Sequence, residues 1–102
     1  MDIKFSEWAN NCLKEIFRYY CEESNPEKAY EIVNKIIDRA ETLVDNPTRG
    51  RLEEDLKSLG KEHRYLLEYH YKIIYKVEGE NITVTDIFSN YQKPSRKHLR
   101  NK

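Results

Sequence analysis

The chain has 102 residues and a mass of 12.3 kDa, which is the size of one domain over residues 1–102. Its 18 Lys and Arg balance its 18 Asp and Glu, and with only three Gly and three Pro it is neither a low-complexity nor a collagen-like chain. It has no run of the ~20 apolar residues that cross a bilayer and no signal peptide at Met1–Phe5, so we expect a cytoplasmic protein without membrane contact.

The start of the chain predicts a short strand and a helix. Residues 2–5 alternate polar and apolar side chains, which is typical of a strand. Ser6 suits a helix N-cap. Cys12 and Cys21, nine residues apart in the predicted helix, are separated by roughly 13 Å and cannot form a disulfide with each other. A wide apolar stripe at helical spacing defines this helix: Trp8, Ala9, Cys12, Leu13, Ile16, Phe17 and Tyr20.

A second helix is the clearest element of the sequence. Asn25 suits the N-cap and Pro26 the first helical position, and Asp45–Pro47 ends the helix. Two amphipathic helices joined by about four residues pack as an antiparallel hairpin. The apolar positions of the second helix are Ala29, Ile32, Val33, Ile36, Ile37, Ala40, Leu43 and Val44.

The second half of the chain predicts three strands. Residues 48–62 are polar and predict a loop with one helical turn at most. Short β-rich runs follow at 64–69, 71–77 and 82–88. Gly79 lies in the turn between the last two runs, where a positive φ is needed. Because the connections are short, we expect an antiparallel meander.

These elements define an α+β fold with the order β-α-α-β-β-β. The N-terminal strand and the α-helical hairpin pack on a small antiparallel β-sheet, and the hairpin covers one face of it. The other face is free to carry Lys72 and Lys76. A solvated sheet face is the alternative interpretation of these lysines.

A basic C-terminal tail follows the last strand. Residues 1–92 hold 13 basic and 18 acidic side chains, whereas residues 93–102 hold five basic side chains and no acid. Such a tail, with Arg96 and Lys97 near its centre, can bind nucleic acid or an acidic partner. It can also be only a frayed, soluble terminus, and both interpretations stay open.

A series of motifs runs along nearly the whole chain. The first half contains Ala9, Leu13, Ile16 and Tyr19–Tyr20, then Ser24–Ala29, then Leu43, Pro47, Gly50 and Arg51. The second half contains Arg64, Leu66, Tyr71, Ile73, Tyr75 and Val77, and then Ile87–Pro94. In order and spacing this series resembles the RelE/ParE superfamily of toxins from bacterial type II toxin–antitoxin systems.

The resemblance implies a toxin that inhibits bacterial growth, stabilises plasmids and is neutralised by a cognate antitoxin. In such pairs an extended or helical antitoxin segment wraps around the toxin. We expect the segment to lie in an apolar groove between the helical hairpin and the sheet, bordered by Trp8, Tyr20 and Tyr69. A homodimer and a heterotetramer with the antitoxin both stay open.

Two mechanisms follow from the resemblance. A ParE-like toxin binds DNA gyrase and needs no catalytic residues. A RelE-like toxin is a metal-independent endoribonuclease that cuts messenger RNA on the ribosome, with Arg64, Lys72 and Tyr91 as the catalytic candidates. Tyr91 stands where relatives carry an arginine, and it lacks the fixed charge and planar fork that stabilise a phosphorane. The sequence therefore favours gyrase binding.

The remaining polar candidates are assigned to target binding: Lys76, His70, Arg96 and Lys97. The sequence has no His, Cys or Asp cluster with metal-ligand spacing, no Gly-rich phosphate loop and no nucleophile elbow, so we predict no cofactor and no metal. Two further alternatives are a degenerate relative that binds an antitoxin without toxicity and an unrelated α+β binding module.

Overall fold

A computed structural model describes residues 1–52 and 63–89 of the chain. The elements follow the order β1 (Asp2–Phe5), α1 (Glu7–Glu23), α2 (Pro26–Glu41), a 3-10 helix (Thr42–Val44), β2 (Arg51–Leu52), β3 (Arg64–Glu68), β4 (Tyr71–Glu78) and β5 (Asn81–Ser89). The predicted α+β class and the order of its main elements are confirmed. Strand β2 was not predicted: it is a two-residue strand within the stretch expected to be a loop.

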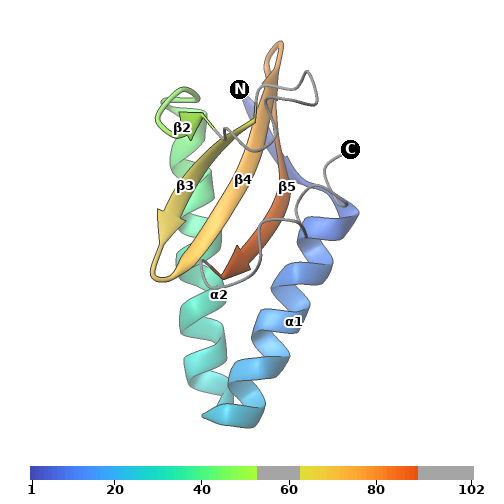
Figure 1. The fold of residues 1–102 in the computed structure, drawn as a ribbon, viewed down its shortest axis with the longest axis vertical. Helices are drawn as coiled ribbons and strands as arrows, with labels where there is room; N and C mark the ends of the chain where they lie inside the picture. The colour runs from blue at the N-terminus through green and yellow to red at the C-terminus, as the bar shows by residue number, and fades with distance from the viewer. Residues whose placement is uncertain (53–62, 90–102) are drawn as a thin grey trace.

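The two helices form the predicted antiparallel hairpin (Figure 1). Ser6 caps α1, where its Oγ accepts a hydrogen bond from the Ala9 N–H at 3.0 Å. Asn25 caps α2 in the same way by accepting from the Lys28 N–H at 2.8 Å, with Pro26 in the first turn. The α-helical part of α2 ends at Glu41, and the expected last turn to Val44 is a 3-10 helix.

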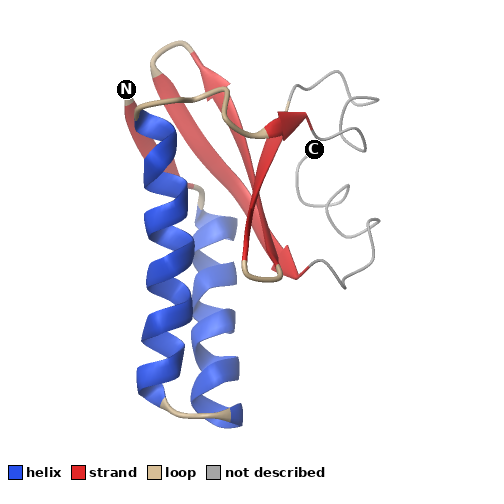
Figure 2. Ribbon diagram, turned by 90° about the vertical axis from the view of Figure 1, so that its left-hand side faces the viewer, coloured by secondary structure: helices blue, strands red, loops and turns tan. Residues whose placement is uncertain are grey.

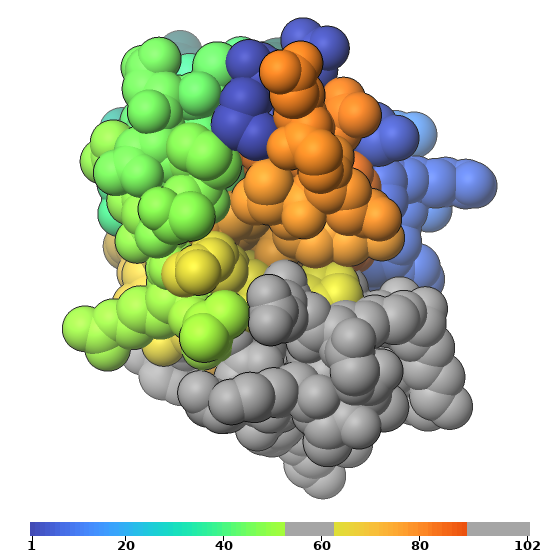
Figure 3. Space-filling view, turned by 90° about the horizontal axis from the view of Figure 1, so that it is seen from above, coloured from blue at the N-terminus to red at the C-terminus, as the bar shows by residue number. Residues whose placement is uncertain are grey.

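The sheet has the strand order β1-β5-β4-β3-β2. Strands β3, β4 and β5 form the predicted antiparallel meander, and Gly79 in its second turn has a φ of +61°. The sheet is mixed rather than purely antiparallel, because β1 pairs with β5 in parallel, from Asp2 opposite Asn81 to Phe5 opposite Val84. Figure 3 shows the N-terminal residues between the β4–β5 hairpin and the segment before β2.

One face of the sheet packs on the helices and forms the core, as Figure 2 shows in profile. Apolar side chains from both layers meet there, and each fully buried Leu, Ile or Val contributes about 1.5–3 kcal/mol. The core residues of the helices, including the 3-10 helix, are Ala9, Cys12, Leu13, Ile16, Ile32, Ile36, Ala40 and Leu43, and those of the sheet are Leu66, Tyr71, Ile73, Tyr75, Ile82, Val84 and Ile87.

A β-bulge interrupts the pairing of β4 with β5. Ile74 lies opposite Asp86 and Tyr75 lies opposite Val84, so Thr85 has no partner residue on β4. Bulges change the direction of nearby side chains. Here Asp86, only 1% exposed, accepts hydrogen bonds from Trp8 Nε1 at 3.1 Å and Cys12 Sγ at 3.5 Å. The bulge therefore fixes the start of α1 against β5.

Candidate functional site

A groove of about 740 Å³ lies between the helical hairpin and one end of the sheet. Figure 2 shows that the hairpin extends past that end of the sheet. One wall comes from the second half of α1, with the start of α2 at its end. The other wall comes from the β3–β4 turn and the end of β5. The lining residues are Cys12, Glu15, Ile16, Tyr19, Tyr20, Glu23, Ser24, Lys28, Tyr69, His70, Tyr71, Ile87, Phe88 and Ser89.

A hydrogen-bonded chain of side chains crosses this groove. His70 Nε2 lies 3.2 Å from the Tyr20 hydroxyl, and His70 Nδ1 lies 3.3 Å from Ser89 Oγ. The Tyr71 hydroxyl donates to the Tyr20 hydroxyl at 3.5 Å. These bonds join α1, β4 and the end of β5, so they fix the shape of the groove floor.

Tyr69 stands at the rim of the groove in a strained conformation. Its φ is +58°, a left-handed value that non-glycine residues rarely adopt and that costs about 1–3 kcal/mol. The residue is 62% exposed, and the centroid of its ring lies 4.5 Å from that of His70. Tyr69 is the first residue of the two-residue turn between β3 and β4, where a positive φ matches the twist of the paired strands. The turn therefore holds an exposed aromatic side chain at the rim of the groove.

The structure brings together three of the residues that the sequence singled out. Tyr20 and Tyr69 line the groove as predicted. His70, expected to bind the target, lies between them: it is hydrogen-bonded to Tyr20, and its ring contacts that of Tyr69. Trp8 is a correction: it is not among the lining residues, because its indole N–H is bonded to Asp86 near the other end of α1.

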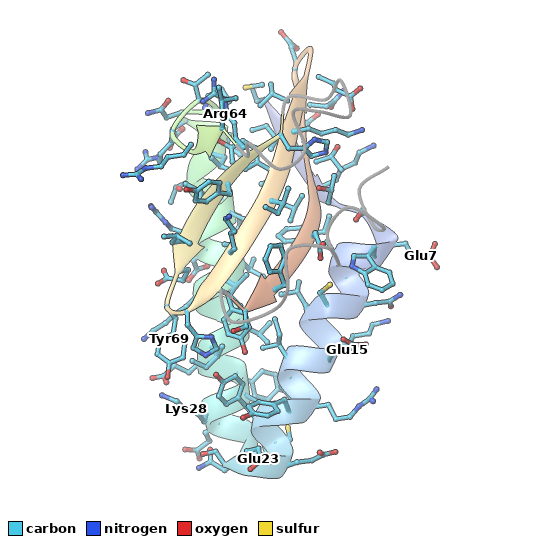
Figure 4. All side chains as sticks on the ribbon, in the orientation of Figure 1. Glu7, Glu15, Glu23, Lys28, Arg64 and Tyr69 are labelled. Atoms are coloured by element: carbon cyan, nitrogen blue, oxygen red, sulfur yellow. The ribbon has the colours of Figure 1, made fainter. Side chains whose placement is uncertain are left out.

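Two of the catalytic candidates, Arg64 and Lys72, lie on opposite faces of the sheet. Arg64 lies on the same face as the core residue Leu66, and its Nη1 donates to the Gly50 carbonyl at 2.9 Å. Lys72 lies on the opposite face, with Nζ 4.1 Å from the centre of the Tyr65 ring. Figure 4 shows Arg64 at the far end of the sheet from Tyr69.

Lys76 lies on the same face of the sheet as Lys72, opposite the helices, as predicted. Its Nζ lies 3.0 Å from Glu78 Oε1, and this contact lowers the pKa of the Glu78 carboxyl. The other candidates, Tyr91, Arg96 and Lys97, lie outside the described residues.

Three charged residues of the groove were missed by the sequence analysis. Glu15 and Glu23 follow one line of α1 with Tyr19 between them, at a spacing of four residues, and this i, i+4, i+8 pattern was the available signal. Lys28 forms an ion pair with Glu31 at 2.8 Å, which raises the pKa of the Lys28 ammonium group. The two carboxylates on α1 thus give the groove an acidic character.

Burial makes two tyrosines resist ionisation. It raises the pKa of the Tyr71 hydroxyl, with a further contribution from the hydrogen bond to Tyr20, and it also raises the pKa of Tyr75. Because the pKa of each tyrosine is higher in the folded than in the unfolded state, its contribution to the free energy of unfolding is fully present below about pH 10. This contribution is lost as the pH rises from the unfolded-state pKa toward the folded-state pKa.

We therefore expect the free energy of unfolding to fall above about pH 10, by up to about 1.4 kcal/mol per pH unit for each tyrosine. Urea unfolding at pH 8, 10 and 11 measures this loss. Tyr71→Phe removes one ionisable group and flattens the slope above pH 10. Equal slopes for the wild type and Tyr71→Phe contradict the assignment.

Within residues 1–52 and 63–89, no group of three or more His, Cys, Asp or Glu side chains is arranged to hold a metal ion. No helix in the same ranges is long and apolar enough to span a membrane.

The architecture described above is that of a small toxin of the RelE/ParE type. Residues 3–94 match the family model described as the ParE toxin of the type II toxin–antitoxin system parDE. The chain therefore belongs to the ParE toxin family, and the predicted resemblance is confirmed.

A solved structure agrees with this membership. The chain is similar to a chain of the chromosomal ParDE toxin–antitoxin system from P. aeruginosa, with 25% sequence identity and a TM-score of 0.71. The match covers 87% of this chain and 95% of the other. No curated protein sequence matches the chain. Membership in a toxin–antitoxin system implies that a cognate antitoxin is its partner.

Proposed function

We propose that this ParE-type toxin inhibits bacterial growth in the cytoplasm by binding DNA gyrase, and that the cognate antitoxin neutralises it. The observation that carries the choice of target is the separation of Arg64 and Lys72 on opposite faces of the sheet. A ribonuclease must focus its cations on one phosphate in the transition state. Two side chains on opposite faces of a sheet cannot meet there.

Arg64 has a structural role that is in keeping with this proposal. Its guanidinium group holds the Gly50 carbonyl, and the Gly50 N–H in turn donates to the Tyr75 hydroxyl at 2.9 Å. Binding to a protein target needs surface complementarity rather than a set of converging reactive groups.

Pulse labelling after induction of the chain alone tests the target. Thymidine incorporation is expected to fall within minutes, before amino-acid incorporation does, and purified toxin is expected to inhibit DNA supercoiling by gyrase. Co-expression of the co-encoded antitoxin is expected to restore growth.

Lys72→Ala serves as the matched variant, and it is expected to keep gyrase inhibition within about threefold of the wild type because Lys72 contributes no reactive group. If translation stops first, and Lys72→Ala abolishes messenger RNA cleavage, the endoribonuclease mechanism is correct instead.

A further inference from the structure

The groove combines acidic and aromatic side chains in a way that selects a particular partner chemistry. Glu15 and Glu23 are exposed residues on α1, and Tyr19, which is 55% exposed, lies between them along the helix. Tyr69 contributes a second exposed ring from the β3–β4 turn. Aromatic faces and carboxylates both attract cations, and the rings also pack on the apolar stems of long basic side chains.

The cation already present in the groove does not neutralise this charge. The Lys28 ammonium group is paired with Glu31 at 2.8 Å, so its charge is already balanced by a carboxylate on its own helix. Figure 4 shows Lys28 on α2 and Glu15 higher on α1, with Glu23 at the end of the hairpin. Glu15 and Glu23 therefore leave the groove with a net acidic potential that complements a basic ligand.

We propose that the groove binds a segment of the cognate antitoxin through two basic side chains, one at Glu15 and one at Glu23. This inference rests on the proposed neutralisation by an antitoxin. Eight residues of α-helix separate the carboxylates by about 12 Å along the axis. The basic residues of the partner are then about four positions apart in an extended segment or about eight apart in a helical one.

Arginine fits these positions better than lysine. Its planar guanidinium group binds a carboxylate with two parallel hydrogen bonds and stacks on a tyrosine ring at the same time. The β3–β4 turn holds the exposed side chain of Tyr69 at the rim of the groove, where its ring can pack on the stem of a basic side chain.

The test measures the Kd of the full-length chain for its co-encoded antitoxin by calorimetry. The double variant Glu15→Gln with Glu23→Gln is expected to weaken binding about 30-fold, and the affinity of the wild type is expected to fall more steeply with salt. Glu22→Gln is the matched control, because it removes the same charge from the same helix at an exposed position outside the groove. It is expected to change the Kd less than twofold.

Tyr69→Gly separates binding from folding. Glycine relieves the left-handed φ, so the variant is expected to unfold at the same or a higher urea concentration than the wild type, while antitoxin binding weakens about tenfold. A purely structural residue would not show these opposite effects.

Three outcomes overturn the inference. An unchanged Kd in the double variant shows that the carboxylates do not contact the antitoxin. Tighter binding by that variant assigns the groove to the basic tail of the chain itself, residues 93–102. Loss of a toxin homodimer in the double variant assigns the groove to a second copy. If the wild-type chain does not bind the antitoxin, the proposed neutralisation is rejected as well. The proposed gyrase target is tested separately, by the supercoiling assay.

Discussion

Replacing Gly50 by alanine is expected to lower the free energy of unfolding by about 3 kcal/mol, which lowers the melting temperature by about 15 °C. A Cβ at this position would lie 2.6 Å from the Tyr65 carbonyl oxygen, 2.6 Å from the Tyr75 hydroxyl and 2.8 Å from Tyr75 Cε1. The carbonyl belongs to β3, and the Tyr75 ring is fully buried, so neither group can move freely.

The clash also disrupts a set of hydrogen bonds around Gly50. The Tyr75 hydroxyl accepts from the Gly50 N–H and donates to the Pro47 carbonyl, both at 2.9 Å, and Arg64 donates to the Gly50 carbonyl. Each bond broken in a buried place costs about 1–3 kcal/mol when a partner is left unsatisfied. The substitution therefore loosens the connection between α2 and the sheet.

Urea unfolding of Gly50→Ala and Gly79→Ala compares the cost of a steric clash at Gly50 with the cost of backbone strain at Gly79. Gly79 has a φ of +61°, but a Cβ there meets no atom within 4 Å, so alanine adds only backbone strain of about 1 kcal/mol. A loss at Gly50 no greater than that at Gly79 would show that the loop yields to the added methyl group.

Replacing Asp86 by alanine is expected to cost about 3 kcal/mol of folding stability. Its Oδ1 accepts from Trp8 Nε1, Cys12 Sγ and the Ile87 N–H, the last at 2.8 Å. Burying a carboxylate is costly, and these donors compensate for the lost hydration. Alanine leaves the donors without this acceptor and also opens a void beside α1.

The matched variant is Asp86→Asn, which keeps a carbonyl oxygen and nearly the same volume, and a loss of only about 1–2 kcal/mol is expected. Trp8 is the single tryptophan of the chain, so its fluorescence reports this site without a label. The emission is expected to shift in Asp86→Ala. Equal stability of the two variants would mean that the hydrogen bonds of Asp86 contribute little.

Elements with local signals were predictable from the sequence. Ser6 and Asn25 cap helices because their side chains accept hydrogen bonds from nearby N–H groups, and Gly79 adopts a positive φ in a short turn. Tyr20 and Tyr69 were placed in one groove because the helical hairpin and the sheet must meet along their apolar faces. Such inferences need only the spacing of apolar residues and the hydrogen-bonding and backbone preferences of single residues.

Features that depend on distant pairing were not predictable. The parallel pairing of β1 with β5 and the bulge at Thr85 leave no mark on the local pattern, and Asp86 looked like an ordinary polar residue of a strand. The sequence did not show which face of β3 carries Arg64. Leu66 lies on the same face as Arg64 and Leu67 on the opposite face, so both faces of the strand are partly apolar. Trp8 was misplaced for a related reason, since its position on the apolar stripe does not show that Asp86 binds its N–H.

The pairing of β1 with β5 also sets an order on folding during synthesis. The helical hairpin depends on contacts between neighbouring segments, so it can form while the rest of the chain is still being translated. The N-terminal strand must wait for residues 81–84 before it can enter the sheet. The end of β5 also supplies Ser89 to the groove. The nascent chain on the ribosome therefore lacks its complete sheet until late in translation, and the surface that we assign to the antitoxin is assembled among the last parts of the fold.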